Sequence, residues 1–265
     1  MADETQAPGA VTWDVDERGV ATVRLNRPER NNAYDGTLIQ GLHDALDALG
    51  TMPGLRAVAV SGNGRHFQAG ADLKWLAEVR SADAAENHRV SKATADAVDR
   101  LNRAPVPTFA AIRGACVGGG TGLIAACDVV VATETAKFAI SEVRWGLTAA
   151  IIVPQLVDAI GVRQLRRYAL TGEMFSAQDA QRIGLVHDVV PDDQLEDRVA
   201  ELISKTLENA PVAIAETKAQ ILAEGRGLAS PDHFESLIAS HAKKRQSDEA
   251  SEGLASFHEK RSARW

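Results

Sequence analysis

A run of small residues near the middle of the chain, 115–122, has the composition of a binding site made by the backbone. Three consecutive glycines, Gly118 to Gly120, stand between a strand-like run that ends near Arg113 and a helical run that begins at Leu123. Glycines at such a junction let the backbone turn sharply and approach another molecule closely. Amides at a helix start lack internal partners, and they bind a phosphate or stabilise a carbonyl oxygen that gains negative charge. A tight turn without chemistry explains the run equally well.

The run differs from the common nucleotide-binding loops. No Gly-Lys-Ser/Thr follows it, which excludes a Walker loop. It lies far from the start of the chain, and no acidic strand end follows at the distance that a Gly-x-Gly-x-x-Gly motif requires. A second loop of small and polar residues, 61–72, offers the backbone another place to meet a ligand.

The composition is that of one large globular domain, or of one domain with a helical appendage. The chain has 265 residues, of which 45% are hydrophobic and 25% charged, and its formal net charge of −7 argues against nucleic acid as a partner. We expect no membrane span, because no apolar run reaches about 18 residues, and no signal peptide. Cys116 and Cys127 lie among apolar residues without metal-ligand spacing, so we predict two buried thiols, no metal and a reducing, cytoplasmic location.

Strand-like and helix-like runs alternate over the first half of the chain, which is typical of a layered α/β fold with parallel strands. The runs expected to be strands are 11–15, 20–25, 55–60, 107–113, 129–131 and 136–140. The runs expected to be helices are 38–49, a helix from Leu73, 83–103 and 123–127, with Asp35 and Asp72 as N-caps. Helices dominate after Ser141, at 156–170 with Gly161 inside it, 177–183, 192–209 and 211–224, with one short extended piece at 186–190.

The order of these pieces resembles the crotonase superfamily, also called the enoyl-CoA hydratase/isomerase superfamily, over nearly the whole length. The segments that carry the resemblance are LNRPERNNA at 25–33, GRHFQAGADL at 64–73, GACVGGG at 114–120, AACD at 125–128, KFAISEVRWGL at 137–147, LTGE at 170–173, AQRIGLV at 180–186 and EGLASFHEKR at 252–261. Each segment alone is weak, but their shared order and spacing are specific.

The resemblance implies a ClpP/crotonase-like α/β fold, in which a spiral of stacked ββα units spans residues 1–195. A C-terminal helical region, 196–265, would then form the trimer contacts. It also implies a homotrimer or homohexamer and an acyl-CoA thioester substrate. Coenzyme A would enter as part of the substrate, and no metal or redox cofactor is implied. We expect neither a nucleic acid nor a membrane as partner.

The resemblance also assigns the site. The backbone amides of Ala71 and Gly119 are expected to hold the thioester oxygen, which becomes negative when an enolate forms, and small residues suit that role because the amides act without side chains. Glu142 matches a catalytic acid–base position. The residues expected to bind the CoA ester are Arg30, Ala33, Ala69, Ala71, Asp72, Leu73, Gly119, Gly122, Arg144, Phe257 and Lys260.

One position departs from the pattern of hydratases that use two glutamates. The first glutamate position is occupied by Gly122, which cannot transfer a proton. Glu142 then performs both transfers in turn, or a substrate carboxylate assists, or the reaction needs only one acid, as isomerisation and decarboxylation do. The string 141–147 resembles the branch that hydrates glutaconyl-type CoA esters, and there Arg144 is expected to pair with the distal carboxylate of the substrate.

The leading hypothesis is therefore an enoyl-CoA hydratase, a hydro-lyase that acts on an α,β-unsaturated acyl-CoA of branched or glutaconyl type. The alternatives are an enoyl-CoA isomerase or acyl-CoA decarboxylase with Glu142 as its single acid, and a CoA-ester-binding protein without catalysis. A serine protease of related architecture is disfavoured, because no Ser, His and Asp set falls in suitable places.

Overall fold

The computed structural model describes residues 9–225 and 231–261, and it contains two β-sheets. The larger sheet has six strands in the order β1-β2-β3-β4-β6-β9. Its strands are β1 (Val11–Val15), β2 (Val20–Leu25), β3 (Ala57–Gly62), β4 (Thr108–Ile112), β6 (Val129–Thr133) and β9 (Asp188–Val190). The first two strands are antiparallel and the others pair in parallel. The smaller sheet contains β5 (Ala115–Val117), β7 (Lys137–Ala139) and β8 (Phe175–Ser176).

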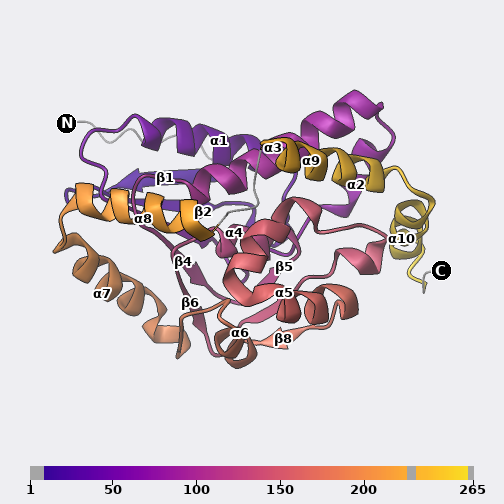
Figure 1. The fold of residues 1–265 in the computed structure, drawn as a ribbon. Helices are drawn as coiled ribbons and strands as arrows, with labels where there is room; N and C mark the ends of the chain where they lie inside the picture. Colours follow the sequence, from indigo (N-terminus) through magenta and orange to yellow (C-terminus); the bar gives the residue numbers. More distant parts are fainter. Residues whose placement is uncertain (1–8, 226–230, 262–265) are drawn as a thin grey trace.

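Helices cover the sheets and make up most of the second half of the chain (Figure 1). They are α1 (Gly36–Gly50), α2 (Leu73–Arg80), α3 (Ala84–Asn102), α4 (Gly119–Ala125), α5 (Val153–Thr171), α6 (Ala177–Ile183), α7 (Leu195–Leu207), α8 (Pro211–Gly225), α9 (Pro231–Arg245) and α10 (Asp248–His258). Short 3-10 turns are η1 (Pro28–Arg30), η2 (Glu142–Trp145), η3 (Ala150–Ile152) and η4 (Asp192–Gln194). The predicted α/β class with parallel strands is confirmed.

Both faces of the large sheet are apolar, because each face packs against helices. Along β3, Val58 and Val60 join the core formed with α1 and α3, while Ala57 and Ala59 join a second cluster. That second cluster includes Leu195 of α7, on the other side of the sheet. Successive strand residues point to opposite faces, so the apolar runs of the central strands are those of strands buried on both sides.

Two helices differ from the sequence prediction, and the first difference matters for the site. The helix expected at 123–127 begins four residues earlier, so Gly119 is its first residue and the glycine run forms its first turn. The helix expected at 192–209 is divided into η4 and α7. The interruption at Gly161 is confirmed, because this residue has φ +68° and ψ 157° inside α5.

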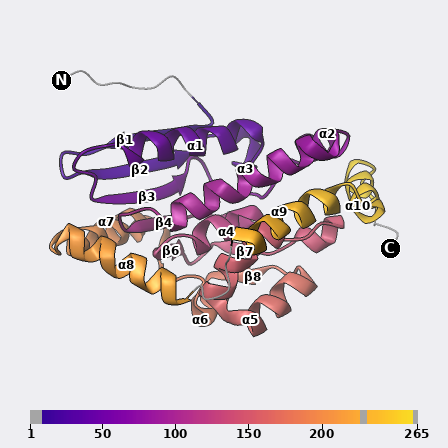
Figure 2. The ribbon, with the colours of Figure 1, turned by 45° about the horizontal axis from the view of Figure 1, so that its top comes forward.

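The C-terminal helices pack back onto the first half of the chain. Helix α9 lies along α3, and α10 lies against η2 (Figure 2). The predicted oligomerisation role of residues 196–265 and the boundary at 195 stay predictions. Among the residues that the structure describes, no helix is long and apolar enough to cross a membrane, and no cluster of three or more metal-ligand side chains occurs.

Candidate active site

A cleft of about 700 Å³ opens between the loops that follow β2 and β3, the turn before α4, η2 and the helices α9 and α10. Most of the site residues predicted from the sequence line it. Those lining residues are Arg30, Ala33, Ala69, Ala71, Asp72, Leu73, Gly119, Glu142, Arg144 and Phe257. Tyr34, His241 and Arg245 also line it, and the sequence analysis did not single them out. Their binding roles stay predictions, but their convergence on one cleft is a structural finding.

Two extended segments run side by side into this cleft and carry the two predicted amides. They pair in parallel at Gln68 and Cys116. Ala71 and Gly119 each follow that pair by three residues, so they lie at the same level of the two segments. Between them Gly70 and Gly118 approach closely, since a Cβ built on Gly118 would lie 3.6 Å from the Gly70 Cα. The parallel pairing is therefore what brings the two amides together.

Local hydrogen bonding leaves both amides free for a ligand. Tyr34 donates its backbone N–H to Gly70 and accepts from the N–H of Asp72, at 2.8 and 2.9 Å. The intervening Ala71 N–H consequently points away from Tyr34. Gly119 is the first residue of α4, where an N–H has no partner inside the helix. Within the described residues neither amide donates a hydrogen bond, so together they can hold one developing oxyanion.

The glycines of the turn are required by its geometry. Gly118 has φ +56° and ψ −127°, a conformation that L-residues with a side chain rarely adopt. A Cβ there would lie 3.3 Å from Oε1 of Glu142, and a Cβ on Gly119 would lie 2.7 Å from the ring of Tyr34. The backbone at this turn thus contacts the acid–base residue on one side and an aromatic ring on the other.

Glu142 is the first residue of η2, and its carboxyl group is enclosed by the protein. Its Oε2 is buried without a hydrogen-bond partner among the described residues. Burial disfavours the charged form and raises the pKa of Glu142 to about 7, although hydrogen bonds from the backbone of Glu142 and Ser141 act in the opposite direction. A carboxyl group with a pKa near neutrality can both accept and donate a proton at physiological pH.

Gly122 does not line the cleft with the other predicted residues, because the space beside it is filled. A Cβ on Gly122 would lie 2.2 Å from Cγ2 and 2.4 Å from Cβ of Ile152. Ile152 is itself buried in the core cluster. A glutamate could not enter position 122 without displacing this isoleucine, so an apolar side chain occupies the place of the first carboxylate.

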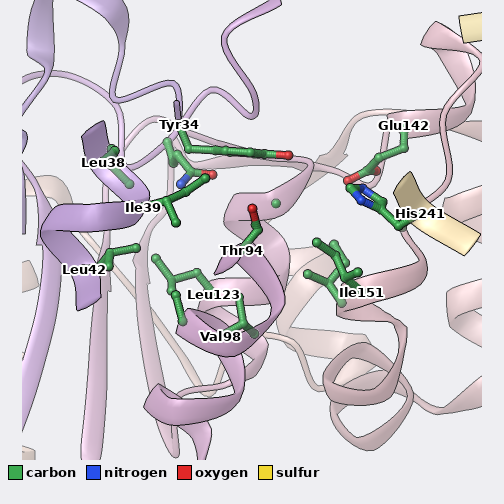
Figure 3. A pocket seen from close by; sticks show the side chains of 15 residues that line it. Tyr34, Leu38, Ile39, Leu42, Thr94, Val98, Leu123, Glu142, Ile151 and His241 are labelled. Carbon is green, nitrogen blue, oxygen red and sulfur yellow. The ribbon is translucent and has the colours of Figure 1, made fainter. Parts of the chain in front are cut away.

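Deeper than the cleft lies an inner cavity of about 30 Å³ (Figure 3). Its floor is apolar, with Leu38, Leu123 and Ile151 among its residues. Glu142 and His241 face each other at one end, and the Tyr34 hydroxyl extends toward them (Figure 3). The cavity has room for at least one water molecule beside these polar groups.

The remaining predicted residues lie around the rim. Asp72 caps α2 by accepting from the amides of Lys74 and Trp75, which confirms its structural role. Arg144 is exposed, and its side chain packs over Gly172. Phe257 is half-exposed and stacks edge-on against the Trp145 ring at 5.2 Å. Lys260 is exposed just beyond α10 and, unlike Phe257, is not among the lining residues of the cleft.

Several buried polar side chains position the loops of the cleft. Asn32 is buried and donates to the backbone oxygens of Asn63 and His66, which joins the two loops that follow β2 and β3. His66 accepts from the Ala115 amide at 2.9 Å, and its pKa is lowered, mainly by burial. Asp128 accepts from Thr108 and pairs with Lys218, so its role is structural.

Comparison with known proteins identifies the same family as the motifs. The family model for enoyl-CoA hydratase/isomerase matches residues 16–265. The chain is 37% identical over 252 residues to a Thermus thermophilus protein that carries the name of an enoyl-CoA hydratase, with 95% of this chain and 99% of the relative covered. It is 32% identical to the 2,3-dehydroadipyl-CoA hydratase of Escherichia coli, with 92% and 94% covered.

The solved structures agree with this result. An enoyl-CoA hydratase/isomerase from Xanthobacter autotrophicus Py2 superposes with a TM-score of 0.85 at 30% identity, and 96% of this chain and 94% of that chain are covered. The predicted crotonase fold is therefore confirmed. Taken with the motifs and the site, these matches show that the chain belongs to the enoyl-CoA hydratase/isomerase family, within the crotonase superfamily.

Proposed function

We propose that this protein is an enoyl-CoA hydratase that adds water to an α,β-unsaturated acyl-CoA, with Glu142 as its single acid–base residue. The observation that carries the proposal is the placement of Glu142 beside two unpartnered amides. Its Oε1 lies against Gly118, the residue before the Gly119 amide, and its pKa is raised to about 7. An enolate chemistry needs this combination, a preorganised pair of donors and one proton carrier near the adjacent carbon.

In the proposed reaction the thioester oxygen accepts hydrogen bonds from the amides of Ala71 and Gly119. Glu142 as carboxylate takes a proton from water while the water oxygen bonds to Cβ. The electron pair of the double bond moves to Cα and the thioester oxygen. The same carboxyl group then delivers the proton to Cα, so that one water is added in total. Ile152 beside Gly122 explains why one residue performs both transfers.

A second candidate is favoured by the same absence of a carboxylate at position 122. Isomerisation of a double bond and decarboxylation each need one protein acid, and the site described above supplies one. Product masses separate the three reactions, because hydration adds one water, isomerisation leaves the mass unchanged and decarboxylation removes carbon dioxide. The experiment is incubation with a panel of enoyl-CoA and acyl-CoA esters, followed by mass spectrometry of the products.

The role of Glu142 is tested with Glu142→Gln, which keeps the shape and removes the proton carrier. General acid–base catalysis contributes about 10²- to 10⁴-fold, so we expect turnover to fall by that factor while CoA-ester binding is retained. Glu78→Gln is the matched control, because Glu78 is an exposed residue of α2. Full turnover in Glu142→Gln on every ester would refute the role. Tight binding without turnover in the wild type would favour a CoA-binding protein.

We also propose the remaining roles that the resemblance implies. The residues that line the cleft, from Arg30 to Phe257, bind the CoA ester, and the acyl group is of branched or glutaconyl type. The E. coli relative is named for 2,3-dehydroadipyl-CoA, whose acyl group carries a free carboxylate, and this supports the choice of substrate. The protein acts without a metal or redox cofactor, which predicts unchanged turnover after treatment with a chelator. It acts in the cytoplasm. It assembles as a homotrimer or homohexamer, and sedimentation analysis measures the mass of that assembly.

A further inference from the structure

Arg245, at the end of α9, is a buried cation on the wall of the cleft. Its side chain is 2% exposed. Its Nη2 donates to the backbone oxygen of Asn87 at 2.5 Å and to Oγ of Ser91 at 2.6 Å, and its Nε donates to Oδ1 of Asn87 at 3.3 Å. All of these acceptors are neutral. Among the described residues, no carboxylate forms an ion pair with Arg245.

A buried charge without a counter-ion is costly, because water and an opposite charge are both missing. Burial accordingly lowers the pKa of the Arg245 guanidinium, and the phenol of Tyr34, not a carboxylate, acts in the opposite direction. Arg245 lines the cleft. An anion bound in the cleft would therefore supply the missing partner.

His241, one helical turn before Arg245, adds a second donor on the same face of α9. Its Nδ1 lies 3.0 Å from Oγ of Ser91. Because that hydroxyl accepts a hydrogen bond from Arg245, its own hydrogen is available to Nδ1. The ring hydrogen then resides on Nε2, so the imidazole is a donor at its other nitrogen. Burial lowers the pKa of His241 to about 3, and the ring is neutral at physiological pH.

His241 lines both the cleft and the inner cavity, whereas Arg245 lines the cleft only. The Tyr34 hydroxyl extends toward this end of the cavity (Figure 3). Burial raises the pKa of Tyr34 to about 12, so this group also keeps its hydrogen. Beside Glu142 the cleft therefore presents a cation and two neutral donors, and the cation with these donors matches a carboxylate.

We propose that Arg245 and His241 form a subsite for a carboxylate carried on the acyl part of the substrate, so that the enzyme selects thioesters of dicarboxylic acids. This inference rests on the proposed function for its choice of a CoA thioester as ligand. It moves the recognition of the carboxylate from Arg144, which the sequence analysis favoured, to α9. Arg144 is exposed at the rim, where water already solvates its charge.

The test measures binding of saturated thioesters, which cannot be hydrated, so it is independent of turnover. Calorimetry compares glutaryl-CoA with pentanoyl-CoA, which has the same number of acyl carbons and no carboxylate. We expect the wild type to bind glutaryl-CoA at least tenfold more tightly, and equal affinities would overturn the proposal. If both esters bind without this preference and enoyl-CoA is still hydrated, the subsite fails while the proposed function stands.

Variants assign the preference to residues. Arg245→Met should reduce the ratio of the two affinities to about one while pentanoyl-CoA binding changes less than twofold, and this retained binding shows that the variant is folded. His241→Phe removes one donor without removing the cation, and we expect a several-fold smaller preference. It serves as the decisive variant if Arg245→Met does not fold. A folded variant of either residue with an unchanged preference would overturn the proposal.

Two controls test whether another arginine or another anionic group of the ligand accounts for the preference. Arg144→Met should keep the preference for glutaryl-CoA. If this variant loses the preference, Arg144 binds the acyl carboxylate and the proposal for Arg245 is overturned. Pantetheine thioesters lack the nucleotide phosphates of CoA. The wild type should prefer glutaryl-pantetheine to pentanoyl-pantetheine by a similar ratio. Equal binding of these two would contradict the proposal. If Arg245 instead serves a CoA phosphate, Arg245→Met would weaken pentanoyl-CoA and leave pentanoyl-pantetheine unchanged.

Discussion

The two walls of the cleft supply hydrogen-bond donors in different ways. The first, which we call the amide wall, consists of residues 69–73 and 117–119, and its donors are the backbone N–H groups of Ala71 and Gly119. The second, the α9 wall, consists of His241 and Arg245, and its donors are side chains held by Ser91 and Asn87. In the proposed complex the amide wall faces the thioester oxygen, which every CoA ester has. The α9 wall would face a part of the acyl group that differs between substrates.

Under the two proposals, this difference lets one cleft combine a reaction common to all CoA thioesters with selection among their acyl groups. Backbone donors are positioned by strand pairing, so they act without a side chain. Side-chain donors can be replaced without disturbing the sheet, so they are free to vary with the substrate. We therefore expect changes in the amide wall to reduce turnover on all esters, and changes in the α9 wall to alter the preference among them.

Among changes in the two walls, the largest effect is expected from Gly118→Ala in the amide wall. The positive φ of Gly118 strains an alanine, and the new methyl group would contact Oε1 of Glu142. Both effects displace the Gly119 amide, and loss of one oxyanion donor costs about 10²- to 10³-fold in kcat. Steady-state kinetics on two different esters should show the same loss. Gly50→Ala, with open space around the new methyl group, should keep full turnover.

The next effect concerns stability and pH. The pKa of Glu142 rises from 4.5 in the unfolded chain to about 7 in the folded protein. A raised pKa contributes stability that is complete below pH 4.5 and is lost as pH rises through about 7. The loss amounts to about 3 kcal/mol at 1.36 kcal/mol per pKa unit. Urea unfolding at several pH values measures the free energy of unfolding of the wild type and of Glu142→Gln. The difference between the two free energies should change with pH by this amount. A difference that stays constant with pH would contradict it.

The same ionisation predicts the pH dependence of hydration. The carboxylate form of Glu142 must take the first proton from water, so kcat/KM should rise with pH through about 7 and then level off. A decarboxylase in which Glu142 acts only as an acid would show the opposite slope. The pH–rate profile therefore sharpens the choice between the two candidate reactions.

A smaller effect is expected behind the amide wall from Gly122→Ala. Its methyl group would overlap Ile152, and overpacking of a core costs about 1–3 kcal/mol. Chemical denaturation measures this loss. The double variant Gly122→Ala with Ile152→Val should recover part of the stability, because the larger side chain is shortened. If the single variant is as stable as the wild type, Ile152 does not confine this position.

The smallest effect is expected from Ser91→Ala, a change in the α3 residue that holds both side chains of the α9 wall. His241 loses its hydrogen-bond donor and Arg245 loses one acceptor, each an interaction worth about 1 kcal/mol. Turnover on a neutral enoyl-CoA should change less than on a dicarboxylic ester. Equal losses on both esters would remove the distinction between the walls. Thr94→Ser is a control on the same helix, because it keeps the hydroxyl that bonds to Val90.

The sequence by itself predicted the amide wall, because the glycines at 118–120 indicate a sharp turn and the resemblance assigns the amides of Ala71 and Gly119. Gly70 and Gly118 have positive φ, and such a local requirement is visible in residue types. The alternation of apolar runs predicted the layered α/β class, and the shared order of short motifs predicted the family. Glu142 was predicted as the acid–base residue because it lies inside one of those motifs. Its raised pKa was not predicted from the sequence.

Only the tertiary structure decided how the rest of the cleft is made. Ile152 reaches Gly122 because η3 packs on α4. Arg245 and Ser91 are 154 positions apart and meet because α9 lies along α3. Burial, and with it the pKa of Glu142, depends on every element that encloses the site. Contacts between residues so distant in the chain leave no local pattern of size, charge or period, and they exist only once the whole core has packed.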